Sequence, residues 1–174
     1  HWMNDGDLAG GGILMTNSIH HIDLLRYYIG NVKRVRGVCR TIQPEMINGA
    51  EDLVSATLEF DNGAIGDVFG NWTTFRTPEV MSYMVFGENG TLHSTPPGPG
   101  GMAGQFGTTL VSSKARDDGR GYQFRPVDPI ENALPSTDGF VNEILHFEEC
   151  CRRGEESISS GKDNLETIKT IMGI

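Results

Sequence analysis

Two adjacent histidines lie where the sequence gathers several side chains that can do chemistry. His20 and His21 fall within a helical pattern, close to Thr16, Asn17 and Asp23. A histidine near neutral pH, oriented by a neighbouring amide, hydroxyl or carboxylate, takes a proton from a hydroxyl group and later returns it. The spacing fits such acid/base chemistry at His20. It equally fits a structural pair of His20 and Asp23, because helical histidines without a known site are seldom catalytic.

A metal site is a further interpretation of the two histidines. Adjacent helical residues point about 100° apart, so both imidazoles do not easily share one ion. The sequence has no second cluster of acids and histidines to complete a coordination shell. No metal ligand is predicted.

The element that must position these side chains is a helix from residue 13 or 14 to residue 29. Apolar residues recur in it at spacings of three and four, with Ile19, Ile22 and Leu25 on the predicted core face. Gly30 is a suitable C-terminal cap. The helix has a predicted polar stripe on its other side, formed by Thr16, His20, Asp23 and Tyr27.

Three glycines, Gly10, Gly11 and Gly12, lead directly into this helix. Together they permit backbone angles or close approaches that a Cβ atom would forbid. Plain loop flexibility is the simpler interpretation of the same residues.

The chain after the helix is rich in β-forming residues. Turns of the type acid-Asn-Gly at residues 61–63 and 88–90 indicate two hairpins. Residues 32–94 are therefore predicted to form five consecutive strands in an antiparallel meander. A Pro/Gly-rich loop follows over residues 94–107, and shorter strands are expected at about 108–112 and 122–127.

Two helices close the sequence. One is predicted from Thr137-Asp138 to Gly154, with an apolar stripe, and the last from about Lys162. The order of elements predicts an α+β fold, with an open, mostly antiparallel sheet and helices packed on one face. The predicted apolar stripes are Phe140, Ile144, Phe147 and Cys151 in the first helix, and Leu165, Ile168 and Ile171 in the second.

Trp72 and Arg76 stand at the end of a predicted hairpin strand. An indole and a guanidinium there are suited to hold a sugar-like ligand by stacking and hydrogen bonding. An amphipathic strand end on the sheet surface explains the same residues equally well.

Composition narrows the class of partners. The 174 residues carry a net charge of −9, with the acids scattered, which disfavours nucleic acids and anionic membranes as partners. No apolar run is long enough to span a bilayer. The three cysteines form neither a disulfide framework nor a zinc spacing, so a reducing cytoplasm is the expected location. The chain starts within an apparent loop and ends in helical rhythm, which suggests a piece of a longer protein.

The stretch GGGILMTNSIHHIDLLRYYIG resembles the segment that opens the C-terminal domain of the Gfo/Idh/MocA oxidoreductases, whose pattern is roughly GGGxLxDxGxHxxDLLRxLxG. The later stretches LEFDNGAIG, VFGENGTL and NEILHFEECCRRG also look like that family, so the resemblance covers nearly the whole chain. It implies the α+β fold of the glucose-fructose oxidoreductase-like C-terminal domain.

The resemblance also implies a function. In this family an N-terminal Rossmann domain, which residues 1–174 do not include, binds NAD or NADP. The C-terminal domain holds a sugar, inositol or related polyol and commonly forms oligomers through its open sheet face. Residues 1–174 are then a single substrate-binding and oligomerisation domain, expected to be inactive alone. His20 matches the family's acid/base histidine, the predicted substrate contacts are Thr16, Asn17, His21, Trp72 and Arg76, and the predicted cofactor contacts are Gly10, Gly11 and Gly12.

One position departs from the pattern. Many members have an aspartate four residues before the histidine, where this sequence has Thr16. A neutral side chain cannot assist His20 by charge, so Asn17 becomes the foremost candidate for orienting the substrate. The departure also leaves open an alternative, a non-catalytic sugar-binding or dimerisation module of the same fold.

Overall fold

The computed structural model describes residues 1–73, 82–88, 90–95, 107–115, 122–126 and 138–174. The chain divides into two compact units. His1–Thr77 and Ile158–Ile174 form the first unit, and Pro78–Ser157 form the second. None of the helices within the described ranges is long and apolar enough to cross a lipid bilayer.

The first unit is built on a three-stranded antiparallel sheet with β2 in the centre. Its strands are β1 (Val32–Arg40), β2 (Leu53–Phe60) and β3 (Ile65–Asn71). The predicted Asp61-Asn62-Gly63 turn joins β2 to β3, and Gly63 has a φ of 88°, in the left-handed region that favours glycine. Alternate residues of β2 are fully buried and form the inner face of the sheet: Val54, Ala56, Leu58 and Phe60.

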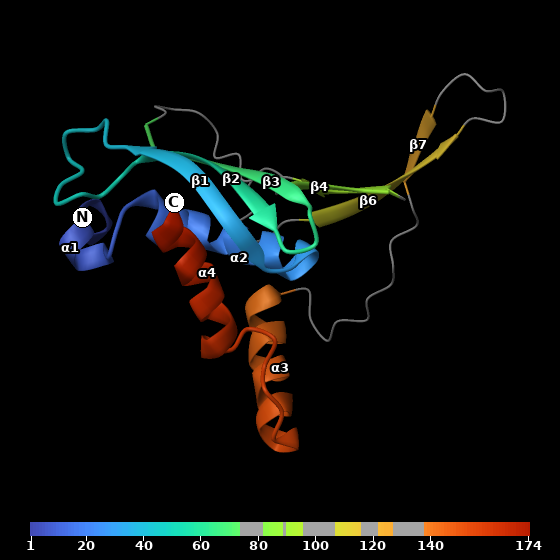
Figure 1. Cartoon of the computed structure of the whole chain (residues 1–174). Helices are drawn as coiled ribbons and strands as arrows, with labels where there is room; N and C mark the ends of the chain where they lie inside the picture. Colours follow the sequence, from blue (N-terminus) through green and yellow to red (C-terminus); the bar gives the residue numbers. More distant parts are fainter. Residues whose placement is uncertain (74–81, 89, 96–106, 116–121, 127–137) are drawn as a thin grey trace. The chain divides into compact units, whose positions relative to one another are not determined.

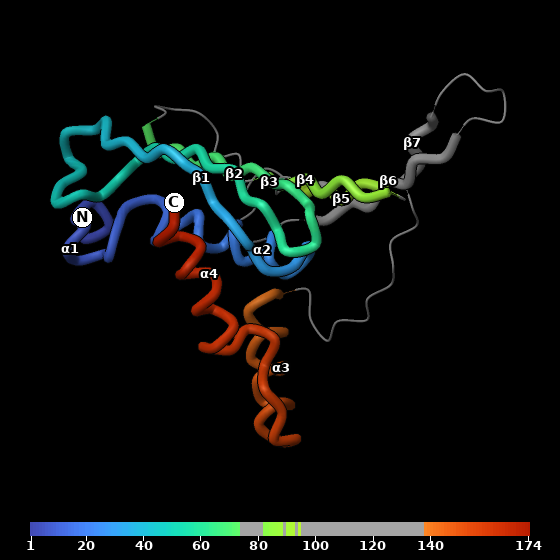
Figure 2. The backbone as a smooth tube through the Cα atoms, viewed as in Figure 1, coloured from blue at the N-terminus to red at the C-terminus, as the bar shows by residue number. Residues whose placement is uncertain are grey.

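Two helices cover this inner face, as Figure 1 shows. They are α2 (Ile19–Ile29), which packs on β3, and α4 (Gly161–Gly173), which packs on β1 and on α2. The short segments η1 (Trp2–Asn4) and α1 (Gly6–Ala9) lie beside the connection between β1 and β2 (Figure 2). The α2 helix ends at Gly30, as predicted, and the Gly30 N–H donates to the Arg26 carbonyl.

The start of the first helix differs from the prediction. A π-helical turn, η2 (Leu14–Ser18), precedes α2. A π-helical turn holds one residue more than an α-helical turn, which shifts the phase of the residues around it. Ser18 is therefore buried, whereas Ile19, predicted to face the core, is only half-buried. A Cβ on Gly70 of β3 would lie 2.6 Å from the Ser18 Oγ, so the helix approaches the sheet closely at this pair.

The second unit contains a four-stranded antiparallel sheet in the order β4-β5-β6-β7. Its helix, α3 (Gly139–Arg153), begins after Asp138, whose carboxylate accepts from the Phe140 N–H, and ends at Gly154, as predicted. Cys150 is its buried cysteine. The predicted apolar stripe is wrong, because all four of its residues are exposed: Phe140, Ile144, Phe147 and Cys151. The strands are β4 (Met84–Gly87), β5 (Gly90–Thr95), β6 (Gly107–Ala115) and β7 (Tyr122–Pro126).

The α+β class, with open antiparallel sheets and helices, is confirmed. The five strands predicted between residues 32 and 94 all form, but they belong to two sheets. Tight turns dictate antiparallel pairing of the strands that they join, whereas the longer connection between β3 and β4 does not.

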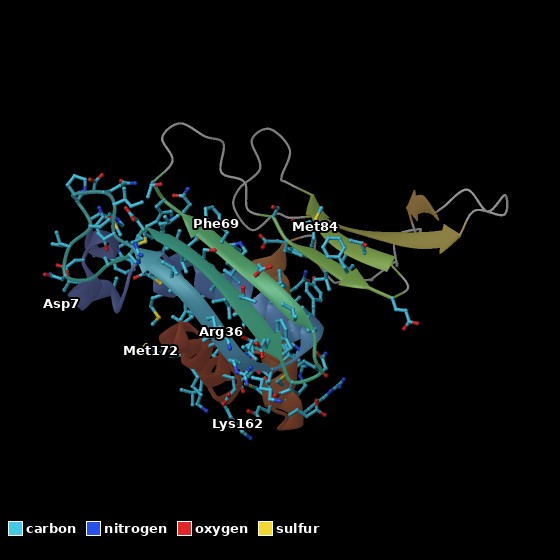
Figure 3. All side chains as sticks on the ribbon, turned by 45° about the horizontal axis from the view of Figure 1, so that its top comes forward. Asp7, Arg36, Phe69, Met84, Lys162 and Met172 are labelled. Carbon is cyan, nitrogen blue, oxygen red and sulfur yellow. The ribbon has the colours of Figure 1, made fainter. Side chains whose placement is uncertain are left out.

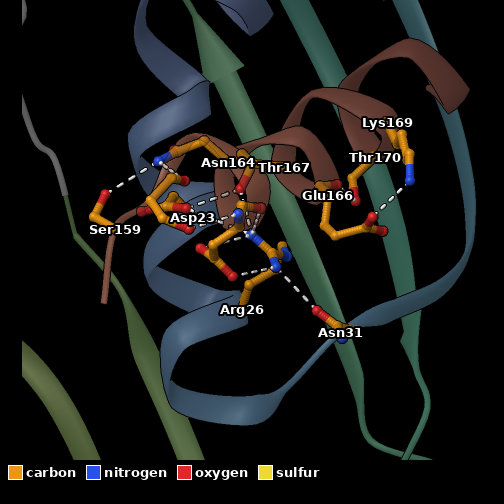
Figure 4. A network of polar contacts seen from close by, with 11 residues as sticks. Asp23, Arg26, Asn31, Ser159, Asn164, Glu166, Thr167, Lys169 and Thr170 are labelled. Carbon is orange, nitrogen blue, oxygen red and sulfur yellow. Dashed lines mark hydrogen bonds and ion pairs between the residues drawn. The ribbon is translucent and has the colours of Figure 1, made fainter. Parts of the chain in front are cut away.

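A buried arginine joins α2 to α4 (Figure 4). The Arg26 side chain is only 5% exposed. Its Nη1 donates to the Thr167 Oγ1 at 2.6 Å, and its Nη2 donates to the Asp163 Oδ1 at 3.0 Å and to the Asn31 Oδ1 at 2.9 Å. The Thr167 hydroxyl donates in turn to the Asp23 Oδ1 at 2.8 Å. A buried charge needs such partners, because its desolvation otherwise costs several kcal/mol, on the order of the stability of a domain.

The core face of α4 differs from the prediction, and the Arg26 network accounts for the difference. Thr167, Thr170 and Ile171 are buried, whereas Leu165 is 56% exposed and Ile168 is half-buried. The helix is rotated so that Thr167 reaches Arg26, because the buried guanidinium requires a polar partner that apolar periodicity does not register.

Replacing Arg26 with alanine is expected to lower the free energy of unfolding by about 2 to 3 kcal/mol, because Thr167 and Asp163 lose a charged hydrogen-bond donor. Urea denaturation measures the difference. Arg152→Ala is the matched control: this arginine of α3 is 63% exposed and pairs with Glu148 and Glu149 on the surface. Its loss is expected to change the stability by less than about 0.5 kcal/mol. Equal effects of the two substitutions would contradict the structural role of Arg26.

Candidate active site

The glycine loop, Gly10 to Gly12, is hydrogen-bonded to Glu51, which lies two residues before the start of β2. The Glu51 carboxylate accepts the N–H of Gly12 through Oε2 and the N–H of Leu14 through Oε1, both at 2.8 Å. The Ile13 N–H donates to the Glu51 carbonyl at 2.8 Å. Three N–H groups at the start of the helical segment, which have no partner within a helix, are therefore satisfied by one residue.

The requirement for glycine differs along the loop. A Cβ on Gly12 would lie 1.9 Å from the Glu51 carbonyl oxygen, so Gly12 is needed for close packing of two backbones. Gly10 has a φ of 79° and ends α1 in the left-handed region. Gly10 is exposed and Gly11 half-buried, whereas Gly12 is buried. The first two glycines are thus accessible to a ligand, whereas Gly12 packs against the Glu51 backbone and is not.

Thr16 and Asn17 lie in the π-helical turn. The Thr16 hydroxyl donates to the Gly12 carbonyl at 2.7 Å, so its proton holds the start of the helix together. The half-buried Asn17 side chain forms no hydrogen bond to any residue that the structure describes. Its amide therefore retains both donor and acceptor capacity for a ligand.

The two histidines occupy different environments. His20 is exposed, and no described residue forms a hydrogen bond with its ring. His21 is half-buried, and burial, together with the positive charge of a protonated His20, lowers the pKa of His21 below its ordinary value. His21 is accordingly held in the neutral form, and His20 is the imidazole that is open to exchange a proton with a ligand.

His20 lines an open depression of about 360 Å³ on the side of α2. The buried Arg26 and the exposed Tyr27 lie further along the same depression. Of the predicted site residues within the described ranges, His20 alone lines it. The complete lining is His20, Asp23, Leu24, Arg26, Tyr27, Asn31, Ile158, Ser159 and Asp163.

Trp72 directly follows β3 and is half-buried. Its N–H donates to the Asp52 carbonyl at 2.8 Å, and its carbonyl accepts from the Gln43 side-chain amide. These contacts fix the backbone of Trp72 at the sheet end where β2 begins. Arg76, the other residue predicted there, lies outside the described residues.

Sequence reasoning missed Glu51 and Asp52. The carboxylate of each accepts two backbone N–H groups: that of Glu51 binds Gly12 and Leu14, and that of Asp52 binds Ile42 and Gln43 at 2.9 and 2.8 Å. Local capping patterns could not find Glu51, because it lies 39 residues from Gly12 in the sequence. The only signal in the sequence was the pair of adjacent acids before a β-rich run. Such a pair does not predict which distant backbone groups the carboxylates bind.

The sequence matches the model of the GFO/IDH/MocA C-terminal domain over residues 1–93 of 174. The chain belongs to this family. Scyllo-inositol 2-dehydrogenase (NAD(+)) of Bacillus subtilis (strain 168) is 27% identical over 167 residues, which are 94% of this chain and 44% of that protein. The resemblance predicted from the glycine and HxxDLL motifs is therefore confirmed.

Solved structures agree with the Gfo/Idh/MocA fold. The aldose-aldose oxidoreductase from Caulobacter crescentus, complexed with glycerol, matches with a TM-score of 0.74 and 25% identity over 99% of this chain and 47% of its own. An NAD binding oxidoreductase from Klebsiella pneumoniae matches in fold, with a TM-score of 0.76 and 17% identity over 100% of this chain and 50% of its own. The chain thus spans about half the length of these relatives.

The lowered pKa of His21 predicts a pH dependence of stability. The folded protein binds fewer protons than the unfolded chain between the folded pKa of His21 and its ordinary value of about 6.5. The stability contributed by neutral His21 is therefore complete above about pH 6.5 and declines as the pH falls through that value. Urea denaturation between about pH 5 and 8 measures the decline.

His21→Gln is expected to remove this part of the pH dependence, while His146→Gln, at an exposed histidine of α3, retains it. An NMR titration that gives His21 a pKa above its ordinary value would contradict the prediction.

Proposed function

We propose that this chain is the substrate-binding domain of an NAD(P)-dependent oxidoreductase that acts on a sugar, an inositol or a related polyol. Membership of the Gfo/Idh/MocA family supports the reaction class, and the scyllo-inositol 2-dehydrogenase relative supports the substrate class. A separate N-terminal Rossmann domain would bind most of the cofactor, with residues 1–174 working as one functional domain. The observation that carries the proposal is the exposed His20 imidazole, which lines a depression on the helix bearing the family motif.

His20 is the proposed acid/base residue. A bound nicotinamide would supply the acceptor or donor of the hydride exchanged with the carbon that bears the reacting hydroxyl. The His20 imidazole takes the hydroxyl proton when that carbon is oxidised and gives it back when the carbon is reduced. Thr16 is no charged partner for this histidine, because it is neutral and its hydroxyl donates to the Gly12 carbonyl.

The glycine loop fits a cofactor contact in part. Gly10 is exposed, and a Cβ at this position would meet only the Met15 side chain, at 3.8 Å. Gly10 and Gly11 would let a nicotinamide ring approach the backbone. Gly12 would hold their position, because it packs against the Glu51 backbone. The choice between NAD and NADP belongs to the Rossmann domain.

Three of the proposed substrate contacts, Thr16, Asn17 and His21, are close to His20 in the sequence. The Asn17 amide has no hydrogen-bond partner among the residues that the structure describes, and it is suited to bind hydroxyl groups of a polyol through its donors and its acceptor. Neutral His21 would add one donor and one acceptor. Thr16 would contribute only acceptor capacity, since its proton is used within the helix start. Trp72, directly after β3, would add a stacking surface, and Arg76 stays a proposed contact on its sequence position alone.

Oligomerisation through the open sheet is a second proposed function of the chain, and the outer face of the β1–β3 sheet favours it. Val38, Ile65 and Phe69 on this face are 53%, 71% and 70% exposed. Between them lie matched polar pairs, Arg34 with Glu59 and Thr57 with Asp67, each at 2.8 Å. Figure 3 looks towards this face, from which Arg36 and Phe69 project. Exposed apolar residues interspersed with paired charges are typical of a surface that binds a second copy.

The acid/base role predicts a large loss of turnover in the complete protein with His20→Ala. The kcat/KM is expected to fall by about 10² to 10⁴, the usual range for loss of a general acid or base. Spectrophotometry of nicotinamide reduction with a panel of sugars and inositols measures it. His146→Ala, at an exposed histidine of α3, is the matched control and should retain full activity. A loss below about tenfold in His20→Ala would rule out the acid/base role of His20. A complete wild-type protein that turns over no member of the panel would favour a non-catalytic module.

The sheet-face proposal predicts that Phe69→Lys dissociates the oligomer without unfolding the protomer, because Phe69 is exposed in the isolated chain. Sedimentation velocity is expected to show smaller species for this variant. Met172→Lys, at a residue of α4 that is 74% exposed, introduces the same charge away from the outer face and should leave the assembly intact. A wild-type protein that is strictly monomeric at high concentration would refute the proposal.

A further inference from the structure

Glu51 lies at the point where the proposed active-site helix begins. Its two carboxylate oxygens bind the N–H groups of Gly12 and Leu14 on either side of Ile13. A carboxylate at this end of a helix also interacts favourably with the helix dipole. We call these two hydrogen bonds from the Glu51 carboxylate the clamp. Thr16 adds a third hydrogen bond beside it, because its hydroxyl donates to the carbonyl of the same Gly12. Loop, carboxylate and helix start thus form one hydrogen-bonded unit.

The amides bound by Glu51 lead directly into the π-helical turn Leu14–Ser18, whose first residue is Leu14. Such turns are rare, occur mostly as single turns in longer helices and are frequent at functional sites. Relaxation into a regular α-helix would turn the residues before and after it by about 100° relative to each other. Asn17 lies within this turn, and His20 lies in the first turn of the α-helix that follows. The state of the turn therefore sets the direction of Asn17 relative to His20.

We propose that Glu51 is a positioning residue for catalysis: its carboxylate holds the π-helical turn and so fixes Asn17 and His20 in their working arrangement. The inference rests on the acid/base role proposed for His20. Glu51 itself acts only through backbone groups, because its carboxylate oxygens are directed to the Gly12 and Leu14 amides.

The distant origin of Glu51 distinguishes it from an ordinary helix cap. An ordinary cap comes from the residue next to the helix and satisfies its end wherever that helix lies. Glu51 lies just before β2, 37 residues after Leu14, and its own carbonyl accepts from the Ile13 N–H. The clamp therefore ties the position of the turn to the sheet as well as satisfying its amides.

The test uses the complete protein with Glu51→Gln and Glu51→Ala. Glutamine keeps the size and one acceptor oxygen, so it can retain one of the two hydrogen bonds, whereas alanine loses both. Hydrogen exchange followed by mass spectrometry is expected to show exchange at least tenfold faster over residues 12–18 in Glu51→Ala, with little change over residues 54–60. The kcat is expected to fall at least tenfold in Glu51→Ala and less in Glu51→Gln. The KM for the cofactor is expected to change less than kcat, because the separate Rossmann domain would bind most of the cofactor.

Glu166→Gln is the matched control, because Glu166 is a carboxylate of α4 that pairs with Lys169 at the surface, away from the glycine loop and the outer sheet face. It should change neither the exchange of residues 12–18 nor kcat. Unchanged exchange in both Glu51 variants would overturn the clamp. Faster exchange with an unchanged kcat would overturn its positioning role.

The His20→Ala variant separates this inference from the proposed function. If His20→Ala is inactive and both Glu51 variants keep full kcat, the positioning role of Glu51 is overturned and the function of His20 stands. If His20→Ala keeps its activity, the acid/base proposal fails, and with it the positioning role of Glu51. A graded loss of kcat in the order alanine, glutamine, glutamate, together with an inactive His20→Ala, supports both.

Discussion

The buried guanidinium of Arg26 holds together the two helices that cover the β1–β3 sheet. A buried cation is tolerated only with close partners, and Arg26 finds them on α4, in Asp163 and Thr167, and after α2, in Asn31. The relative position of α2 and α4 is thereby restricted by directional hydrogen bonds as well as by apolar packing. The helix that carries His20 has its C-terminal half fixed by this network.

The opposite end of the same helical segment is fixed by Glu51. Its carboxylate binds the Gly12 and Leu14 amides, and Gly12 packs directly on the Glu51 backbone. Between these two anchors, His20 remains exposed and Asn17 has no hydrogen-bond partner in the described part of the chain. Proton transfer and substrate orientation both require side chains that are free to bind a ligand on a backbone that does not move.

Thr16 shows how a departure from the family pattern fits this arrangement. An aspartate at this position would place a charge one turn before His20, whereas the threonine hydroxyl closes a hydrogen bond onto Gly12. The position then contributes to the shape of the helix start instead of to the charge of the site. Any polarisation of His20 in this protein must therefore come from bound ligands or from other residues.

Local patterns in the sequence predicted much of the architecture, because they depend on neighbouring residues. Turn residues such as Asn62-Gly63 and the caps Asp138, Gly30 and Gly154 determine element ends through their own backbone and side-chain chemistry. The motif HxxDLL identified the family and selected His20. These features required no knowledge of which distant segments meet.

Contacts between distant segments were decided only by the tertiary structure. Glu51 meets Gly12 across 39 residues, and Arg26 meets Asp163 across 137. These contacts account for the π-helical turn, the burial of Ser18 in place of Ile19 and the rotation of α4 towards Thr167, none of which periodicity could predict. Helical periodicity assumes a regular helix and an apolar interior, and both assumptions fail where a buried charge or a clamped backbone must be satisfied first.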